Sequence, residues 1–437
     1  MFLILSFCQL NSPVRLMRIK PLIIALLLGC SPTKEIDSDS GTTSDTGPTV
    51  TDTGTLDTDT ADTDTAPFPL LPAVPLHTED RWILDAHGDR FKLASVNWYG
   101  FEELDYVPAG LEIAHVSEIA EAIAHLGFNS VRISFSLEMV EQSDPVQPHV
   151  VAANPEMEGL TPIEVMDTVI DALAEEGLVV VLDNHSSEAV WYSATNGLWY
   201  TEDYPESHWI QTWEELTLRY LNHPAVVGFD LRNELRGEAS WGGPPATNWK
   251  AAASRAADAI FAIDDTKLIV VEAINYATDF TGHYWDPLVL SVDNRLVLSP
   301  HDYSWFHGGV TTYEDLARDL GSWWGFLIVQ GMPYTAPVWV GEFGTCNWAE
   351  DCFTGVAGDG TAEDRYNGAW FAVFIEYLAA GDIDWAYWAV NGTMARADDR
   401  EYGALDWFGV LGPNWTDPSS ESLLSALQSI QEPWAFP

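Results

Sequence analysis

The sequence predicts one α/β domain folded as a (β/α)8 barrel of the TIM type, and three observations support this prediction. Apolar runs of four to seven residues alternate with helical stretches along the body of the chain, as expected of a parallel sheet covered by helices. Eight such runs are present, the number that a closed barrel requires. Neither an internal repeat nor a change in composition marks a second folded domain in that body.

Residues 1–30 have the pattern of an export signal. Arg18 and Lys20 precede the apolar run 21–28, which Gly29 and Cys30 follow. A basic start, a short apolar core and a small residue before the cleavage site are typical of a secretory signal. The cysteine resembles a bacterial lipobox, in which Cys30 is lipidated; the alternative is an ordinary signal peptide with an incidental cysteine. We expect an exported protein, lipid-anchored to the cell envelope or surface, or otherwise secreted.

Residues 31–66 are rich in Asp and Thr and contain no aromatic side chain. Such a segment cannot offset its ordering entropy by burial, so we predict a disordered linker. A calcium loop is the alternative for its spaced Asp residues. The turn glycine and closing glutamate of such a loop are missing at the required offsets. The linker therefore separates the predicted export signal from a folded domain predicted at 67–437.

Within the body, the elements follow one another in a regular order. Thr161, Pro162 and Glu164 supply an N-cap, a first-turn proline and a capping-box acid for a helix that ends near Gly177. The apolar run 178–183 comes next and is typical of a strand buried on both faces. The other strands are predicted at 91–96, 130–135, 225–231, 267–272, 296–299, 337–341 and 382–387.

The charge of the chain excludes one large class of partners. Sixty-six Asp and Glu against nineteen Lys and Arg give a formal net charge of −47. Such a surface repels phosphate backbones, so we expect no nucleic-acid partner, and polyanionic polysaccharides are disfavoured for the same reason.

Polar residues gather where the predicted strands end, which in a barrel is the face that carries the active site. Two of them are glutamates, Glu234 and Glu342, each following an apolar run. Facing carboxylates are what the cleavage of a glycosidic bond needs, one as an acid and one charged. The full set is Asn97-Trp98, Arg132, Asp183-Asn184-His185, Asn233-Glu234, Glu272, His301-Asp302-Tyr303, Glu342 and Trp388.

From about residue 81 to residue 392, the sequence resembles glycoside hydrolase family 5, the cellulase family within the clan that carries its catalytic glutamates after strands four and seven. Seven motifs in the same order carry this resemblance. They are 95–102 (SVNWYGFE), 127–132 (GFNSVR), 182–185 (LDNH), 227–234 (VGFDLRNE), 299–303 (SPHDY), 340–344 (VGEFG) and 387–389 (YWA).

The resemblance implies a retaining double displacement in which Glu342 is the nucleophile and Glu234 the acid/base, with no cofactor. It also implies supporting and substrate-binding roles for several other side chains. Arg132 and Tyr303 are expected beside Glu342, His301 beside Glu234, His185 at the rim of the subsite, and Asn233 on the sugar 2-hydroxyl. Platforms that stack on sugar rings are expected from Trp388, Trp98 and Trp241.

Three other features allow a structural interpretation. His185, His301 and His307 lack the tight spacing of metal ligands, so we expect no metal site. Glu272 also ends a strand, and we expect it to be a structural or outer-subsite group rather than a third catalytic acid. Cys346 and Cys352 lie six residues apart in an exported chain, which favours a disulfide over two buried thiols.

The sequence favours a monomeric, surface-tethered retaining β-glycosidase, an endo-β-1,4-glucanase acting on a neutral β-glucan. Many cellulases of the family have proline after the acid/base, whereas here Leu235 follows Glu234, as in a less-characterised branch with plant and bacterial members. This departure leaves β-mannanase and glycolipid glycosidase as rivals. A non-catalytic carbohydrate-binding lipoprotein is the alternative from another class, but both glutamates and their predicted supports are present.

Overall fold

The computed structural model describes residues 70–190, 195–355, 360–398 and 400–431. The predicted signal with its lipidation site Cys30 and the predicted linker 31–66 lie outside the described residues.

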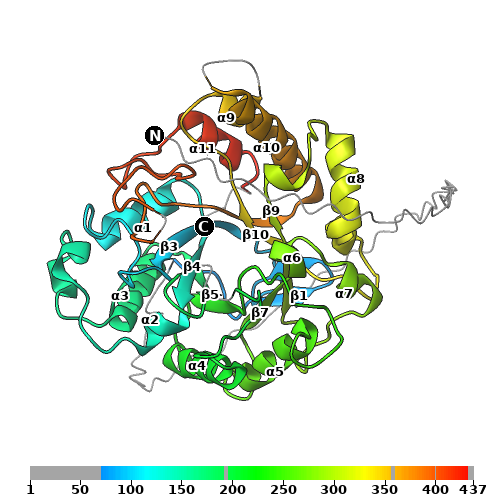
Figure 1. The fold of residues 1–437 in the computed structure, drawn as a ribbon, viewed down its shortest axis with the longest axis horizontal. Helices are drawn as coiled ribbons and strands as arrows, with labels where there is room; N and C mark the ends of the chain where they lie inside the picture. Colours follow the sequence, from blue (N-terminus) through cyan, green and yellow to red (C-terminus); the bar gives the residue numbers. More distant parts are fainter. Residues whose placement is uncertain (1–69, 191–194, 356–359, 399, 432–437) are drawn as a thin grey trace, which may run out of the picture. The chain divides into compact units, whose positions relative to one another are not determined.

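Nine parallel strands form one sheet at the centre of the domain (Figure 1). Their order is β8-β7-β6-β5-β4-β3-β11-β10-β9, so strands that are close in the chain are neighbours in the sheet. This order is what successive β-α-β units produce. The strands are β3 (Ala94–Phe101), β4 (Ser130–Ser136), β5 (Val179–Ser186), β6 (Val226–Asp230), β7 (Leu268–Glu272), β8 (Leu296–Ser299), β9 (His301–Asp302), β10 (Trp339–Phe343) and β11 (Asp384–Tyr387).

Strands β8 and β9 are two halves of one segment, separated by Pro300. Proline has no N–H to donate to a strand ladder, which explains the interruption. β8 pairs with β7, whereas β9 pairs with β10 and places His301 opposite Glu342. A bridge between Leu298 and Val338 adds to the closure. The sheet is a nearly closed TIM-like barrel, and it has nine strands rather than the predicted eight because the strand at 296–299 resumes after Pro300.

Helices surround the strands, as Figure 1 shows. The start of α3 has the predicted form: Thr161 and Glu164 make a reciprocal capping box, and Pro162 occupies the first turn. The longer helices are α1 (Val116–His125), α3 (Pro162–Glu175), α4 (Glu206–Arg219), α5 (Trp249–Phe261), α8 (Tyr313–Trp323), α10 (Ala362–Gly381) and α11 (Glu421–Gln428). The short helices α2 (Leu137–Glu141), α6 (Ile274–Ala277), α7 (Thr281–Trp285) and α9 (Asp351–Thr354) lie in connections that follow strands.

A small antiparallel hairpin, β1 (His77–Glu79) with β2 (Trp82–Leu84), precedes the barrel. Leu76 and Ile83 belong to one buried cluster with Val179, Val227 and Trp339, which lie near the starts of their strands. The hairpin therefore closes the amino-terminal end of the barrel, opposite the polar strand ends. The sequence analysis missed it because three-residue strands carry too little alternation to be detected.

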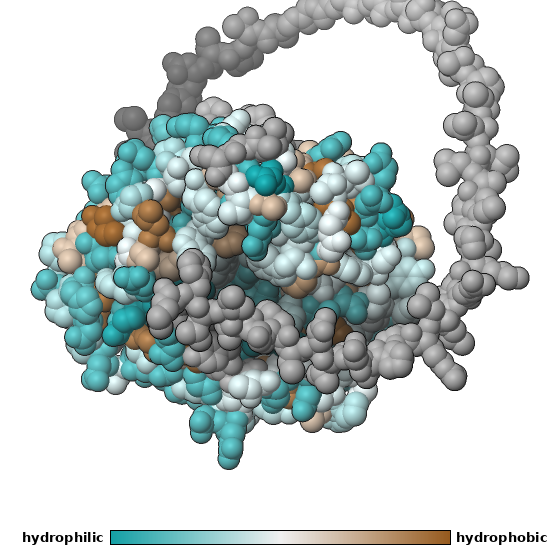
Figure 2. Space-filling view, turned by 45° about the horizontal axis from the view of Figure 1, so that its top comes forward, coloured by the Kyte–Doolittle hydropathy of each residue, from teal (hydrophilic) through white to brown (hydrophobic). Residues whose placement is uncertain are grey.

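On the face shown in Figure 2, hydrophilic residues predominate and the hydrophobic residues form separate patches rather than one continuous area. This agrees with the large negative charge of the chain. Within the described part of the chain, no helix combines the length and the apolar character needed to cross a bilayer.

Candidate active site

Glu234 and Glu342 face each other at the carboxyl ends of the strands. Glu342 lies in β10, and Glu234 follows β6. One carboxylate oxygen of each and a ring nitrogen of His301 all lie within 4.8 Å of one another. They border a cavity of about 330 Å³, whose lining residues are His185, Asn233, Glu234, Tyr303, Trp305, Glu342, Trp388, Arg400 and Phe408. The structure thus brings the two predicted catalytic residues into one cavity.

Glu342 is held by two donors, one on each carboxylate oxygen. Arg132 Nη1 donates to Oε1 at 3.0 Å, and the Tyr303 hydroxyl donates to Oε2 at 3.0 Å. Burial raises the pKa of Glu342 above its usual value, while the nearby charges of His301 and Arg132 oppose this rise. Both donors stabilise the charged carboxylate, which is the form that a nucleophile requires.

Arg132 is fully buried in β4 and is the central cation of the site. Burial by itself lowers the pKa of this guanidinium, but four carboxylates raise it well above the usual value. Its nitrogens lie 2.9 to 3.1 Å from oxygens of Asp183, Asp230, Glu272 and Glu342. Arg132 is therefore charged at any pH at which the protein is folded, and it links Glu342 to the interior of the barrel.

Glu234 adopts a backbone conformation that residues with a side chain rarely take, with φ of 44°. Its N–H donates to Oε2 of Glu272 at 2.6 Å, and its own Oε1 lies 3.2 Å from Nδ1 of His301. Burial raises the pKa of Glu234, but the hydrogen bond and the charge of His301 outweigh burial and lower it. The proton of Glu234 is thus coupled to that of His301.

His301 is fully buried between the two glutamates and Glu272. Its Nδ1 lies 3.2 Å from Glu234 and 3.7 Å from Glu342, and its Nε2 lies 3.3 Å from Oε1 of Glu272. Burial lowers the pKa of His301, yet Glu272 and Glu342 raise it well above the usual value. Because the ring bridges Glu272 and Glu234, its orientation is set from both sides.

Asn233 and His185 form the next part of the cavity wall. The side-chain oxygen of Asn233 accepts from Arg132 at 3.0 Å, and its Nδ2 lies 3.3 Å from Nε2 of His185. His185 Nδ1 is 2.7 Å from Asp183, and the ring stacks on Trp388 at 5.5 Å between centroids. A chain of contacts from Asp183 through His185 therefore holds the amide of Asn233 at the cavity.

The three tryptophans predicted as sugar platforms lie in three different environments. Trp388 lines the cavity and is only partly buried. Trp98 was predicted incorrectly: it is 0% exposed, and its indole N–H donates to the carbonyl of Ala109 at 3.0 Å. Its motif places it inside β3, where it packs in the core. Trp241 lies outside the cavity lining, and its indole N–H donates to the carbonyl of Asp286; its platform role stays a prediction.

The sequence analysis missed three residues that line the cavity, Trp305, Arg400 and Phe408. Trp305 is 60% exposed and stacks on Tyr303 with 4.3 Å between ring centroids. Its position two residues after Tyr303 in the loop beyond β9 was a usable signal. Arg400 pairs with Glu103 at 2.9 Å and lies in a region where the sequence shows no recognisable motif.

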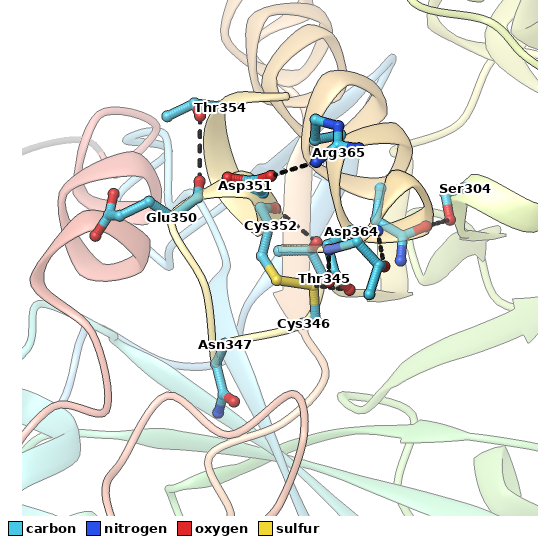
Figure 3. The surroundings of a disulfide bond; sticks show 12 residues. Ser304, Thr345, Cys346, Asn347, Glu350, Asp351, Cys352, Thr354, Asp364 and Arg365 are labelled. Carbon is cyan, nitrogen blue, oxygen red and sulfur yellow. Dashed lines mark hydrogen bonds and ion pairs between the residues drawn. A yellow bond between two sulfur atoms is a disulfide. The ribbon is translucent and has the colours of Figure 1, made fainter. Parts of the chain in front are cut away.

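Cys346 and Cys352 form the predicted disulfide, with a Cα–Cα distance of 5.3 Å (Figure 3). The closed loop begins three residues after β10. Within it, the side chain of Asn347 points away from the sulfur atoms and donates to the carbonyls of Asp406 and Gly409. The disulfide therefore fixes a loop that contacts the segment containing Phe408.

Two groups of acidic and histidine side chains beside Arg132 are close enough to hold a metal ion. One is Glu234, His301 and Glu342, and the other is Asp183, Asp230 and Glu272. Arg132 already pairs with every acid of the second group. In that group the guanidinium supplies the positive charge that a metal would bring. The prediction that the enzyme uses no cofactor stays a prediction.

A TIM-like barrel that presents two facing glutamates, one of them accepting hydrogen bonds from an arginine and a tyrosine, has the architecture of a glycoside-cleaving enzyme. Comparison with known families agrees with this class. Residues 84–393 match the family described as Cellulase (glycosyl hydrolase family 5). The chain belongs to this family.

Relatives and solved structures agree with this assignment. The chain is 32% identical over 359 residues to "Endoglucanase" of Paenibacillus polymyxa, covering 78% of this chain and 83% of that protein. It is 30% identical to "Major extracellular endoglucanase" of Xanthomonas campestris, covering 78% and 68%. The solved catalytic domain of the Xanthomonas enzyme superposes with a TM-score of 0.69 at 26% identity, covering 82% of this chain and 99% of that one. A Pyrococcus horikoshii endocellulase solved with cellotetraose gives 0.68 at 25% identity, with 83% and 100% covered.

Proposed function

We propose that this protein is a retaining endo-β-1,4-glucanase that cleaves a neutral β-glucan by double displacement. The observation that carries the proposal is the closeness of Glu234 and Glu342, whose nearest carboxylate oxygens lie within 4.8 Å of each other. Retaining glycosidases place their carboxyl groups about 5–5.5 Å apart, whereas inverting enzymes leave about 6.5–9.5 Å for a water molecule. The separation in this cavity supports the retaining class.

In the first step, a carboxylate oxygen of Glu342 attacks the anomeric carbon of the sugar in the cavity. The bond from that carbon to the glycosidic oxygen breaks, and Glu234 gives its proton to the departing oxygen. A covalent ester between the sugar and Glu342 results. Arg132 and Tyr303 hold the two oxygens of Glu342, so the attacking group is oriented before the sugar arrives.

In the second step, Glu234 acts as a base on a water molecule. The water oxygen attacks the anomeric carbon, its proton goes to Glu234, and Glu342 leaves as a carboxylate. His301 supports both steps because its Nδ1 lies within hydrogen-bond distance of Oε1 of Glu234, at 3.2 Å. Neutral His301 accepts this hydrogen bond from protonated Glu234, and charged His301 donates it to the anion.

The remaining cavity residues support recognition of a neutral sugar chain. Trp388 and Trp305 present aromatic surfaces, which suit the apolar faces of pyranose rings. Asn233 lines the cavity beside His185 and Arg132, the arginine that holds Glu342. Its amide can reach a sugar hydroxyl from there. The net charge of −47 disfavours acidic polymers. The cellotetraose complex of the Pyrococcus enzyme supports a β-1,4-glucan as the substrate.

We also propose that the enzyme works outside the cytoplasm as a monomer, anchored by a lipid on Cys30. The basis is the sequence of residues 1–66, a basic and apolar start followed by an Asp/Thr-rich linker. The name of the Xanthomonas relative, a major extracellular endoglucanase, supports export. Metabolic labelling with a radioactive fatty acid tests the anchor. Label in the wild type and none in Cys30→Ala is the expected result, whereas equal labelling of both excludes lipidation at Cys30.

The test of the activity is reducing-sugar release from soluble β-glucan, xyloglucan and mannan at low and high salt. The full-length wild type is compared with Glu342→Gln, which removes the nucleophile but keeps the size of the side chain. Release from β-glucan that is absent in the variant supports the proposal. Release from mannan alone would show that the substrate is mannan rather than β-glucan. A folded wild type that releases no sugar from any of the three polymers refutes the glucanase proposal.

A further inference from the structure

Glu272 is a buried carboxylate that contacts the catalytic machinery but not the cavity. It ends β7 and is 0% exposed, and it is not among the residues that line the cavity. A substrate therefore cannot touch it. Its burial also excludes the outer-subsite role that its position after a strand allowed. Any effect of Glu272 on the reaction must pass through its neighbours.

Two hydrogen-bond donors and the ring of His301 converge on the two oxygens of Glu272. Oε2 accepts from the backbone N–H of Glu234 at 2.6 Å. Oε1 accepts from Arg132 Nη2 at 2.9 Å and lies 3.3 Å from Nε2 of His301. These groups come from the connection after β6, from β4 and from β9, so a single side chain joins three separate parts of the barrel.

The contact with the backbone of Glu234 has a specific consequence. Glu234 has φ of 44°, a left-handed conformation that residues other than glycine keep only where their surroundings enforce it. A short hydrogen bond from its own N–H to a buried anion is such an enforcement. The direction in which the Glu234 side chain enters the cavity therefore depends on Glu272.

Resting on the proposed function, we propose that Glu272 is a positioning residue for the acid/base: its anionic carboxylate fixes the backbone of Glu234 and the ring of His301 in the arrangement that delivers the proton. Glutamine cannot replace it, because an amide has one acceptor oxygen, whereas Glu272 accepts from Glu234 on one oxygen and from Arg132 on the other. Aspartate keeps the charge but is one methylene shorter, so it cannot reach both donors and the ring of His301 from the same backbone position.

The charge of Glu272 also affects titration of the site. Burial lowers the pKa of His301, and the negative charge of Glu272 makes the largest contribution that raises it. Loss of this anion makes His301 easier to deprotonate, which removes a cation from beside Glu234 and raises the pKa of Glu234. The charged and titratable groups that face this pair are Glu342, Glu272, Asp230, Arg132, His185, Arg236 and Tyr303.

The experiment compares the full-length wild type with Glu272→Gln and Glu272→Asp. The control is Asp384→Asn, another buried carboxylate that accepts from an arginine and a backbone N–H, Arg90 and Leu93, at the opposite end of the barrel. Each variant is measured on unactivated β-glucan and on an aryl β-cellobioside whose leaving group needs no protonation. Circular dichroism and thermal melting confirm folding.

For Glu272→Gln we expect kcat/KM on β-glucan to fall about 100-fold, the typical cost of misplacing a catalytic group by about 1 Å. We expect a much smaller loss on the activated substrate, because acid assistance matters little there. The alkaline limb of the pH profile, which reports loss of the acid's proton, moves to higher pH. Glu272→Asp, which retains the buried anion and so protects folding, keeps the limb near the wild-type position but loses rate on β-glucan.

The control should lose stability while its pH profile and its ratio of activities on the two substrates stay unchanged. Equal losses on both substrates in folded Glu272→Gln or Glu272→Asp would overturn the positioning role, and so would an unmoved alkaline limb in Glu272→Gln. Full activity of either variant on β-glucan would do the same. A wild type that does not cleave β-glucan at all refutes the proposed function instead, so the two failures are distinguishable.

Discussion

Trp98 and Trp305 offer a direct test of which aromatic residues serve the substrate. Trp98 is 0% exposed and donates to the Ala109 carbonyl, whereas Trp305 is 60% exposed and lines the cavity. We predict opposite effects of truncation. Trp98→Ala lowers stability and leaves substrate affinity unchanged, and Trp305→Ala weakens substrate affinity and leaves stability unchanged.

The magnitude for Trp98 follows from its burial. Removing a fully buried tryptophan costs about 3–5 kcal/mol, because apolar contacts are lost and a cavity remains. The body from 67 to 437 has about 370 residues, so its unfolding entropy near the melting temperature is about 0.8 kcal/mol/K. The melting temperature of Trp98→Ala should therefore fall by about 4–6 °C.

The magnitude for Trp305 follows from its exposure and its stacking. A single aromatic contact beyond simple burial is worth about 0.5–1.5 kcal/mol, which corresponds to a rise in KM of about 2- to 10-fold. The melting temperature of Trp305→Ala should change by less than about 1 °C, since surface substitutions usually change the free energy of unfolding by no more than about 0.5 kcal/mol.

The assay pairs thermal melting with kcat and KM on soluble β-glucan for both variants. A rise in KM for Trp98→Ala with an unchanged melting temperature would refute the burial argument and return Trp98 to the substrate site. An unchanged KM for Trp305→Ala would show that its exposed ring does not support a sugar.

Two further predictions concern the disulfide and the pH profile. Replacing Cys346 and Cys352 by serine removes a short closed loop, which should cost about 2 kcal/mol and lower the melting temperature by about 3 °C; an unchanged melting temperature compared with the oxidised wild type would show that the bond does not stabilise the fold. The acid limb of the kcat/KM profile should lie above the usual glutamate value of 4.5, because burial raises the pKa of Glu342 and the protonated form cannot attack. Activity is then lost as the pH falls through that raised pKa, and a limb below 4.5 would contradict this assignment.

Much of the fold was readable from periodicity and caps. The capping box of Thr161 and Glu164 and the eight apolar runs anticipated α3 and the barrel. The break at Pro300 and the short hairpin β1–β2 were missed, because one proline and two three-residue strands leave little periodic signal. The missing N–H of Pro300 causes the break, whereas tertiary packing rather than local preference determines the hairpin.

The candidate site was predictable where a side chain directly follows a strand. Arg132, Glu234, His301 and Glu342 meet because parallel strands bring their carboxyl ends to one face. The direction of a side chain within the strand was not readable, which is why Trp98 was misplaced. Arg400 lies beyond the last strand, in a connection whose course no sequence pattern specifies.

The central claim is that Glu342 forms a covalent bond with the sugar. The most direct measurement is intact-mass spectrometry of the wild type after incubation with a 2-deoxy-2-fluoro-β-cellobioside carrying a good leaving group. We predict a mass increase of one fluorocellobiosyl unit, located by peptide mapping at Glu342 and absent in Glu342→Gln. An enzyme that hydrolyses β-glucan but gains no mass, or gains it at another residue, would contradict the mechanism.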